Sequence, residues 1–209
     1  MPNSIPNDIY QYSLHSAYNA GLKTGGPPVA FLTNHGTHGI GVFQNGANDM
    51  IQIDSTAYTL SSDGKAAKAS QEMQLPFVKV CVFQPTFRTR VSAGTTLAAL
   101  RETLQQNASQ GKGRNTPMPF SVEGSFKSVK TGRKTFEDVK GTIFGYAIPA
   151  WQSEVSGKGL QCCFLSEDKQ GGGRVAEFET AEGVTMDWAK CGRFHLGFPQ
   201  DEEYEGLSI

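Results

Sequence analysis

A short hairpin in the second half of the chain carries the side chains best suited to chemistry. In segment 159–174, strand alternation points Gln161 and Cys163 to one face, glycines at 171–173 are expected to turn the chain back, and Arg174 opens the returning strand. Arg174 offers a fixed positive charge that can grip a carboxylate, phenolate or enolate by two parallel hydrogen bonds. The trio is a poor metal site, because a neutral amide is a weak zinc ligand and a guanidinium is none.

A carboxylate at the start of another expected strand, Asp49, is the candidate base. Gln161 could donate to a carbonyl oxygen and Cys163 could serve as a weak acid. Arg174 helps a reaction only by facing oxygen charge that grows in the transition state, because its grip on a reacting carboxylate is lost as carbon dioxide leaves. These residues therefore favour isomerisation, dehydration or cyclisation of a carbonyl compound over decarboxylation.

Structural alternatives stay open for the same residues. Unpaired cysteines usually behave as small hydrophobic side chains, so Cys163 could simply fill space. Arg174 could form a structural ion pair with Asp49 that closes a dead pocket. A rebuilt metal site would combine Cys163 with His35 and His38, but the spacing of these histidines is that of a glycine turn without a second thiol.

Several aromatic and imidazole side chains are candidates for substrate contacts, although aromatics in such strands more often belong to the core. These candidates are His35, His38, Tyr146, Trp151 and His195. Other motifs are weak. Segment 36–41 lacks the strand, turn and helix of a dinucleotide loop, and 111–116 lacks the glycine spacing of a phosphate loop.

The elements that must position these residues are mostly expected strands. A helix is expected from Asp8 to Gly21, and another over 95–106, where leucines recur at helical spacing. Alternating or apolar segments predict strands at 29–33, 39–44, 49–54, 56–60, 77–83, 120–123, 125–130, 141–148, 160–165, 175–180, 184–188 and 194–198. Many strands with two helices predict an α+β fold.

Two sheet-based lobes are expected. The chain has 209 residues, of which 38% are hydrophobic, and can bury one substantial core or two small ones. A loop expected over 105–116 is the boundary that separates an N-terminal mixed-sheet lobe, 1–110, from a C-terminal sheet lobe, 111–209, which contains the hairpin.

Composition and net charge restrict the kinds of partner that the protein is expected to bind. A net charge of -1 gives no electrostatic case for nucleic acid or an anionic membrane, and no apolar stretch approaches the length needed to span a bilayer. The N-terminus has neither a basic start nor a hydrophobic segment, and the 4 cysteines suit a reducing compartment. We therefore expect a cytoplasmic protein with a small-molecule substrate.

The hairpin resembles that of the α-acetolactate decarboxylase family, whose pattern is G-[FY]-H-L-H-F-I, an acidic-Lys turn and then G-G-H-V. Further blocks resemble the family in the same order along the chain. They lie at 9–13, 36–41, 49–53, 124–130, 139–145 and 198–204. The resemblance implies the family's two-lobed fold with the site between the lobes, and a homodimer.

The resemblance also marks where this chain departs from the family. Family members bind zinc through three histidines, whose positions are taken here by Gln161, Cys163 and Arg174. Asp49 stands where the family has a catalytic-site glutamate, and Arg133 lies one residue beyond the position of a family arginine. We also expect the family's late glutamate, carried on a C-terminal tail, to be missing.

These departures lead to one expectation and two alternatives. We expect a divergent, metal-independent enzyme with no cofactor, acting on a small keto acid or polyketide-like carbonyl compound through an enolate-like state. The first alternative is acetolactate decarboxylation in acetoin biosynthesis through altered ligands. The second is a non-catalytic protein that binds a small molecule.

Overall fold

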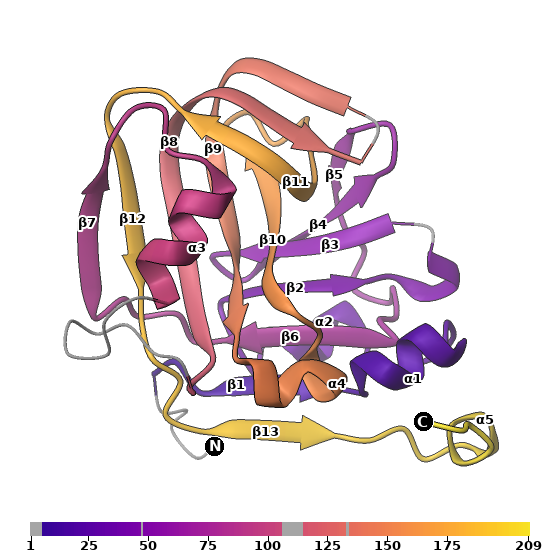
Figure 1. Ribbon diagram of the computed structural model, residues 1–209. Helices are drawn as coiled ribbons and strands as arrows, with labels where there is room; N and C mark the ends of the chain where they lie inside the picture. Colours follow the sequence, from indigo (N-terminus) through magenta and orange to yellow (C-terminus); the bar gives the residue numbers. More distant parts are fainter. Residues whose placement is uncertain (1–5, 47, 106–114, 133) are drawn as a thin grey trace.

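Two β-sheets, each largely antiparallel, form the framework of the protein (Figure 1). The computed structural model describes residues 6–46, 48–105, 115–132 and 134–209. The first sheet has the strand order β13-β1-β6-β2-β3-β4-β5 and the second has the order β11-β10-β9-β8-β12-β7. Strand β11 also pairs with β8, so β8, β9, β10 and β11 close on themselves.

The strands of the first sheet are short. They are β1 (Ile9–Tyr12), β2 (His38–Val42), β3 (Asn48–Ile53), β4 (Thr56–Ser61), β5 (Ala66–Lys68), β6 (Phe77–Cys81) and β13 (Phe194–Gly197). The second sheet contains the two longest strands in the described ranges. Its members are β7 (Phe87–Val91), β8 (Met118–Thr131), β9 (Lys134–Ile148), β10 (Gly159–Ser166), β11 (Gly172–Thr180) and β12 (Val184–Trp188).

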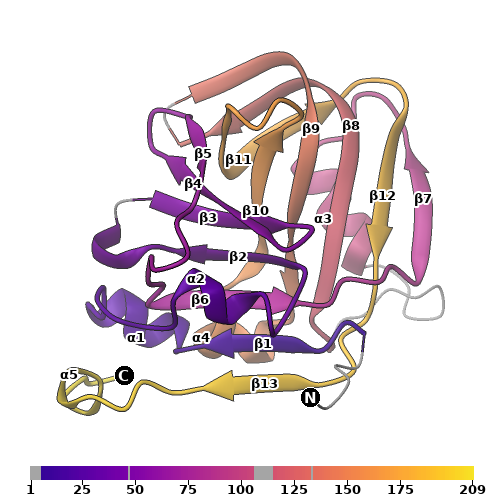
Figure 2. The same ribbon diagram turned by 180° about the vertical axis from the view of Figure 1, so that it is seen from behind.

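Helices are few and short. The α-helices are α1 (His15–Ala20), α2 (Val29–Leu32), α3 (Leu97–Gln105), α4 (Ser153–Ser156) and α5 (Glu202–Glu205), and the 3-10 turns are η1 (Gln44–Gly46) and η3 (Ala150–Gln152). Helix α3 lies over the second sheet in Figure 1, and α2 covers the outer face of the first sheet in Figure 2. No helix in the described ranges is long and apolar enough to cross a membrane.

Hydrophobic burial joins the two sheets face to face. One cluster combines Ile51 and Leu60 of the first sheet with Phe144, Cys163 and Leu165 of the second. A second cluster fills the space between α3 and the second sheet, and a third lies under α2 on the first sheet. The predicted α+β fold of two sheet-based lobes is therefore confirmed.

Two predictions in the N-terminal part of the chain are wrong. Residues 9–12 form strand β1 rather than the start of a helix, because Ile9 and Gln11 point inward and the chain pairs with both β6 and β13. Ser13 then adopts a left-handed φ of 66°, and the helix begins only at His15. Residues 29–32 form α2 rather than a strand, with Val29 and Leu32 buried one turn apart.

The sheets do not follow the order of the chain. β7 comes from the N-terminal half but lies at the edge of the second sheet, and β13, near the C-terminus, lies at the edge of the first. The boundary at 110/111 stays a prediction about domains, while the sheets themselves exchange one strand in each direction across it. Segments 120–123 and 125–130, expected as separate strands, form the single strand β8.

Candidate active site

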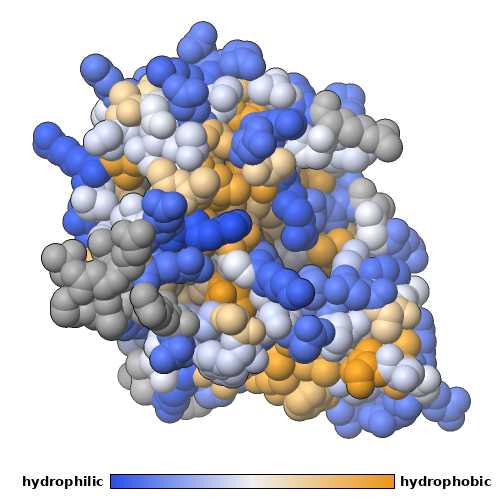
Figure 3. All heavy atoms as spheres, in the orientation of Figure 1, coloured by the Kyte–Doolittle hydropathy of each residue, from blue (hydrophilic) through white to orange (hydrophobic). Residues whose placement is uncertain are grey.

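A cavity of about 560 Å³ lies between the two sheets. His15 and Tyr18 of α1 and Asp49 of β3 line it from one side, and Thr131 and Arg174 line it from the other. Hydrophilic side chains border a hollow on the face drawn in Figure 3. The volume falls within the range of small-molecule sites, about 300–1,000 Å³.

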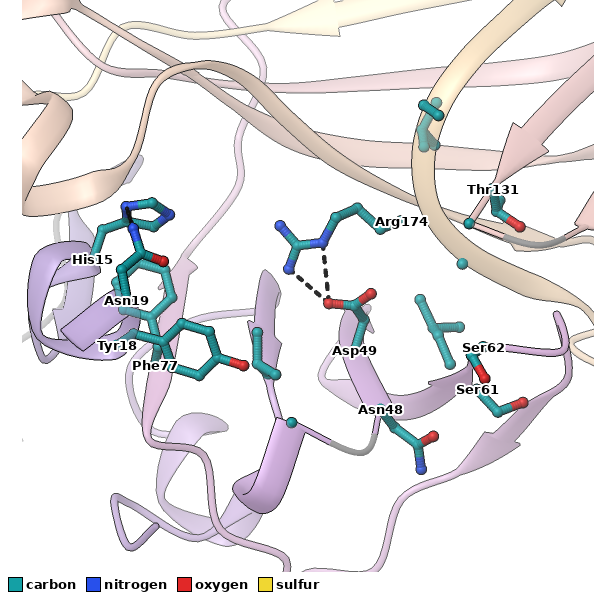
Figure 4. Close-up of a pocket in the computed structure, with 17 residues that line it drawn as sticks. His15, Tyr18, Asn19, Asn48, Asp49, Ser61, Ser62, Phe77, Thr131 and Arg174 are labelled. Carbon is teal, nitrogen blue, oxygen red and sulfur yellow. Dashed lines mark hydrogen bonds and ion pairs between the residues drawn. The ribbon is translucent and has the colours of Figure 1, made fainter. Parts of the chain in front are cut away.

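Arg174 and Asp49 meet across this cavity (Figure 4). Asp49 Oδ1 accepts hydrogen bonds from Arg174 Nη2 at 2.6 Å and from Nε at 3.1 Å. The Arg174 side chain is 49% exposed and the Asp49 side chain 26% exposed. Within the described residues, Arg174 Nη1 and Asp49 Oδ2 have no hydrogen-bond partner. The ion pair between Arg174 and Asp49, one of the alternatives considered from the sequence, is present, but it does not close the cavity beside it.

The hairpin holds Arg174 in place through close backbone packing. The turn lies at 167–170, not at the glycines as expected, because Ser166 Oγ bonds Asp168 and accepts a hydrogen bond from the Gly171 backbone N–H at 2.8 Å. The glycines serve the strand instead. A Cβ added at Gly172 would lie 2.4 Å from the Phe164 carbonyl oxygen, so β10 and β11 can approach only without that side chain.

Cys163 is directly opposite Arg174 in the strand register but points into the core. It is 1% exposed, and burial raises the pKa of its thiol well above the ordinary value. It does not line the cavity. The environment therefore favours a neutral, space-filling thiol.

Gln161 is engaged at both ends of its amide. Its Nε2 donates to the Ser156 carbonyl oxygen at 2.9 Å, and its Oε1 accepts a hydrogen bond from Lys79 Nζ. Ser156 in turn donates through Oγ to Gln11 Oε1 at 2.6 Å. The Gln161 amide therefore belongs to a network that ties α4 to β1 and β6.

Lys79 is a buried charge that the sequence interpretation did not select. It lies on β6, is 1% exposed, and donates to the Ser156 carbonyl oxygen at 2.9 Å as well as to Gln161. Burial, and then the positive charge of Arg174, lower the pKa of Lys79 to about 7. The available signal was a single lysine among apolar residues in the segment 77–81.

These side chains do not suit the family's zinc ion. The ammonium of Lys79 already uses the Gln161 oxygen, and the Arg174 guanidinium offers only N–H donors. Cys163 alone could not hold the ion. Across the described ranges, no group of three or more His, Cys, Asp or Glu side chains gathers as a metal site requires.

The other sequence candidates lie away from this cavity. His35 stacks on Tyr10 with ring centroids 4.3 Å apart, and His38 lies 3.7 Å from the Asp54 carboxylate. Tyr146 is fully buried, and its hydroxyl reaches the His38 carbonyl oxygen at 3.5 Å.

Trp151 is 66% exposed on η3 and donates to the Asn115 carbonyl oxygen, while His195 lies 3.5 Å from the Asp8 carboxylate. None of the five candidates lines the cavity, so the structure does not bring them together with Asp49 and Arg174. Arg133 lies outside the described residues.

Helix α1 supplies cavity residues that the sequence interpretation missed. His15 and Tyr18 line the cavity, and the Asn19 amide nitrogen lies 3.1 Å from His15 Nδ1. Burial raises the pKa of the Tyr18 hydroxyl, with a further contribution from the Asp49 charge, so Tyr18 stays a neutral donor. The signal was the helical spacing of His15 and Asn19, four residues apart.

Comparison with known proteins gives a consistent result. The family profile described as alpha-acetolactate decarboxylase matches residues 9–134 and 130–209. The alpha-acetolactate decarboxylase of Klebsiella aerogenes is 26% identical over 223 aligned positions, covering 97% of this chain and 83% of that protein. The protein of that name from Bacillus subtilis strain 168 is 25% identical, covering 97% of this chain and 86% of the relative.

Solved structures show the same fold. The crystal structure of the Bacillus subtilis strain 168 alpha-acetolactate decarboxylase superposes with a TM-score of 0.88 at 24% identity, covering 96% of this chain and 93% of that one. A Staphylococcus aureus protein of unknown function, described as similar to alpha-acetolactate decarboxylase, superposes with a TM-score of 0.89 at 19% identity. That match covers 97% of this chain and 94% of the other.

Proposed function

Because the chain belongs to the alpha-acetolactate decarboxylase family, a family of lyases, we propose that it is a metal-independent enzyme of this fold. Its substrate would be a small keto acid or polyketide-like carbonyl compound. The observation that carries the proposal is the free guanidinium nitrogen of Arg174, which lines an open cavity while Asp49 holds the rest of the group in place.

Arg174 and Asp49 have different roles in this proposal. Arg174 Nη1 binds an anionic group of the substrate, and Asp49 Oδ2 accepts a proton from the carbon beside the carbonyl group. The electron pair of the broken C–H bond forms an enolate, whose negative charge resides on the former carbonyl oxygen. When a carbon–carbon double bond is conjugated with the enolate, return of the proton to its far carbon gives isomerisation. When the carbon next to the enolate carries a hydroxyl group, the enolate electrons re-form the carbonyl group and expel that hydroxyl, which leaves as water with the proton from Asp49 and gives dehydration.

Metal independence rests on the side chains at the zinc-ligand positions of the family. These side chains cannot coordinate a zinc ion. Arg174 is positively charged, both polar atoms of the Gln161 amide are hydrogen-bonded, and Cys163 is buried. The nearby ammonium of Lys79 would further repel a divalent cation. The pocket therefore stabilises an oxyanion through fixed protein charge and hydrogen bonds.

A substrate screen read by mass spectrometry tests the proposal. Candidate keto acids and diketones are incubated with the protein, and loss of carbon dioxide, loss of water or product of unchanged mass separates the reaction classes. Arg174→Met and Asp49→Asn should each lower kcat/KM by roughly a hundredfold, the effect of removing one charge-stabilising or proton-transfer group.

A matched control is available on the second sheet. Arg88 forms a similar ion pair with Asp187 at 2.7 Å, outside the cavity, so Arg88→Met should leave turnover unchanged. Unchanged turnover in both Arg174→Met and Asp49→Asn would overturn the proposed roles.

Acetolactate decarboxylation is the second candidate, favoured by the names of the relatives. Conversion of acetolactate to acetoin that depends on added zinc would support this candidate and overturn metal independence. Elemental analysis after mild purification gives a separate readout of the metal. The expected homodimer stays a prediction, which sedimentation of the purified protein would test.

A further inference from the structure

His15 occupies a constrained position at the start of α1. Its ring packs edge-on against Phe77, with centroids 5.6 Å apart and an interplanar angle of 69°. Gly157 lies beside the ring, since a Cβ at that position would come within 3.0 Å of His15 Cδ2. These contacts fix one orientation of an imidazole that lines the same cavity as Arg174.

Asn19 determines which nitrogen of His15 carries the proton. The amide nitrogen of Asn19, one helical turn later, lies 3.1 Å from His15 Nδ1. An amide nitrogen can only donate, so Nδ1 must accept and the neutral ring carries its proton on Nε2. Figure 4 shows the second ring nitrogen on the side of the cavity that faces Arg174. Nε2 has no hydrogen-bond partner within the described part of the chain.

Burial, together with nearby positive charges, favours the neutral form of this imidazole. Burial lowers the pKa of His15 below its usual 6.5, and the positive charges of Lys79 and Arg174 lower it further. Glu154 acts in the opposite direction and Lys23 adds a smaller lowering effect. A neutral ring whose Nε2 is already protonated cannot take a proton there, so it can only donate a hydrogen bond into the cavity.

We propose that His15, held by Asn19 as the Nε2–H tautomer, is a catalytic residue that donates a hydrogen bond to the carbonyl oxygen of a keto acid whose carboxylate is bound by Arg174. This inference rests on the proposed function and narrows its substrate class. A neutral imidazole is an effective electrophile for an oxygen that becomes an enolate, because the donor is in place before charge develops. The carboxylate stays intact during the reaction, as proton transfer requires.

The tautomer can be measured without substrate. Long-range ¹H–¹⁵N correlation spectra of histidine-labelled protein at pH 7 should show His15 neutral and protonated on Nε2, with the signals assigned by their loss in His15→Phe. Asn19→Asp places an acceptor at Nδ1, so its His15 should become protonated on Nδ1. Protonation on Nδ1, or a charged ring, in the unsubstituted protein would overturn the inference.

Binding of two simple acids tests the carbonyl contact. Pyruvate and propionate have the same length and charge, but only pyruvate has a carbonyl oxygen beside the carboxylate. By calorimetry, pyruvate should bind roughly two- to tenfold more tightly, the contribution of one net hydrogen bond. His15→Phe should abolish that preference and leave propionate binding unchanged, whereas Arg174→Met should weaken the binding of both acids.

The outcomes separate the two proposals. A preference for pyruvate that survives in His15→Phe would overturn the role of His15 and leave the anion site at Arg174 standing. Failure of both acids to bind the unsubstituted protein would overturn the anion site and, with it, the carbonyl contact. His35→Phe is the matched control, because His35 stacks on Tyr10 outside the cavity and its replacement should keep the preference.

Discussion

Replacing Lys79 with methionine should remove the pH dependence of stability that this buried amine creates. The pKa of Lys79 is lowered from 10.5 to about 7 in the folded protein. Between these values the unfolded chain binds more protons than the folded one, so stability rises with pH across this window. At about 1.36 kcal/mol for each pKa unit, the full effect is roughly 5 kcal/mol.

The variant also loses hydrogen bonds. Methionine fills a similar volume but leaves Gln161 Oε1 without the Lys79 donor, a cost of about 1–3 kcal/mol. At pH 6, where the ammonium must be buried, we expect Lys79→Met to be more stable than the unsubstituted protein by roughly 3 kcal/mol. At pH 10, where the amine is neutral in the folded state, the order should reverse by roughly 1 kcal/mol.

Urea unfolding at pH steps from 6 to 10 measures this difference directly. Titrations that Lys79 does not perturb are shared by the two proteins and cancel when their free energies of unfolding are subtracted. Lys68→Met, at an exposed position on β5, is the control and should give a difference that does not vary with pH. A Lys79→Met difference that is equally flat would refute the depressed pKa.

Two further substitutions and a labelling experiment probe the surroundings of the cavity. Gly157→Ala should destabilise the protein by more than about 1 kcal/mol, because φ is 86° and the new Cβ would lie 2.0 Å from Gln161 Nε2. Gly21→Ala is the control for backbone strain alone, because φ is 122° and no atom lies within 4 Å of the added Cβ. If urea unfolding shows the same loss of stability for both substitutions, crowding at Gly157 is contradicted. Cys163 should resist maleimide in the native protein at pH 7, while the partly exposed Cys191 reacts, as peptide mass spectrometry would show. Rapid native labelling of Cys163 would contradict its burial.

Local sequence patterns predicted the strands and helices correctly wherever the pairing between strands agreed with those patterns. Alternation correctly predicted 184–188 as β12, and helical leucine spacing predicted α3 to within two residues at its N-terminus. Segment 9–12 failed because its strand conformation depends on β6 and β13, which lie far away in sequence. Strand β7 went unpredicted for a related reason, since its strand partner is β12.

The site was only partly accessible to the same reasoning. The family resemblance brought Asp49 and Arg174 forward as a pair, and they do meet across the cavity. The roles of the other side chains depend on how they are oriented relative to the opposite sheet, which the sequence does not show. Cys163 turns into the core. His15 lines the cavity on α1, which packs against α4, and Lys79 of β6 is buried with its ammonium bonded to the Ser156 carbonyl oxygen of α4.

The exchanged edge strands have a consequence for how the molecule assembles. Ile9 of β1 pairs with Phe194 of β13, so the first sheet is complete only when nearly the whole chain has been synthesised. Such distant pairings carry a large loop-closure cost and slow the folding of β proteins. A cut near residue 110 would leave each fragment without one edge strand and with an unpaired backbone edge exposed. Neither half of the sequence contains a whole sheet, and residues of both halves line the cavity, so the cavity can form only when both halves are present.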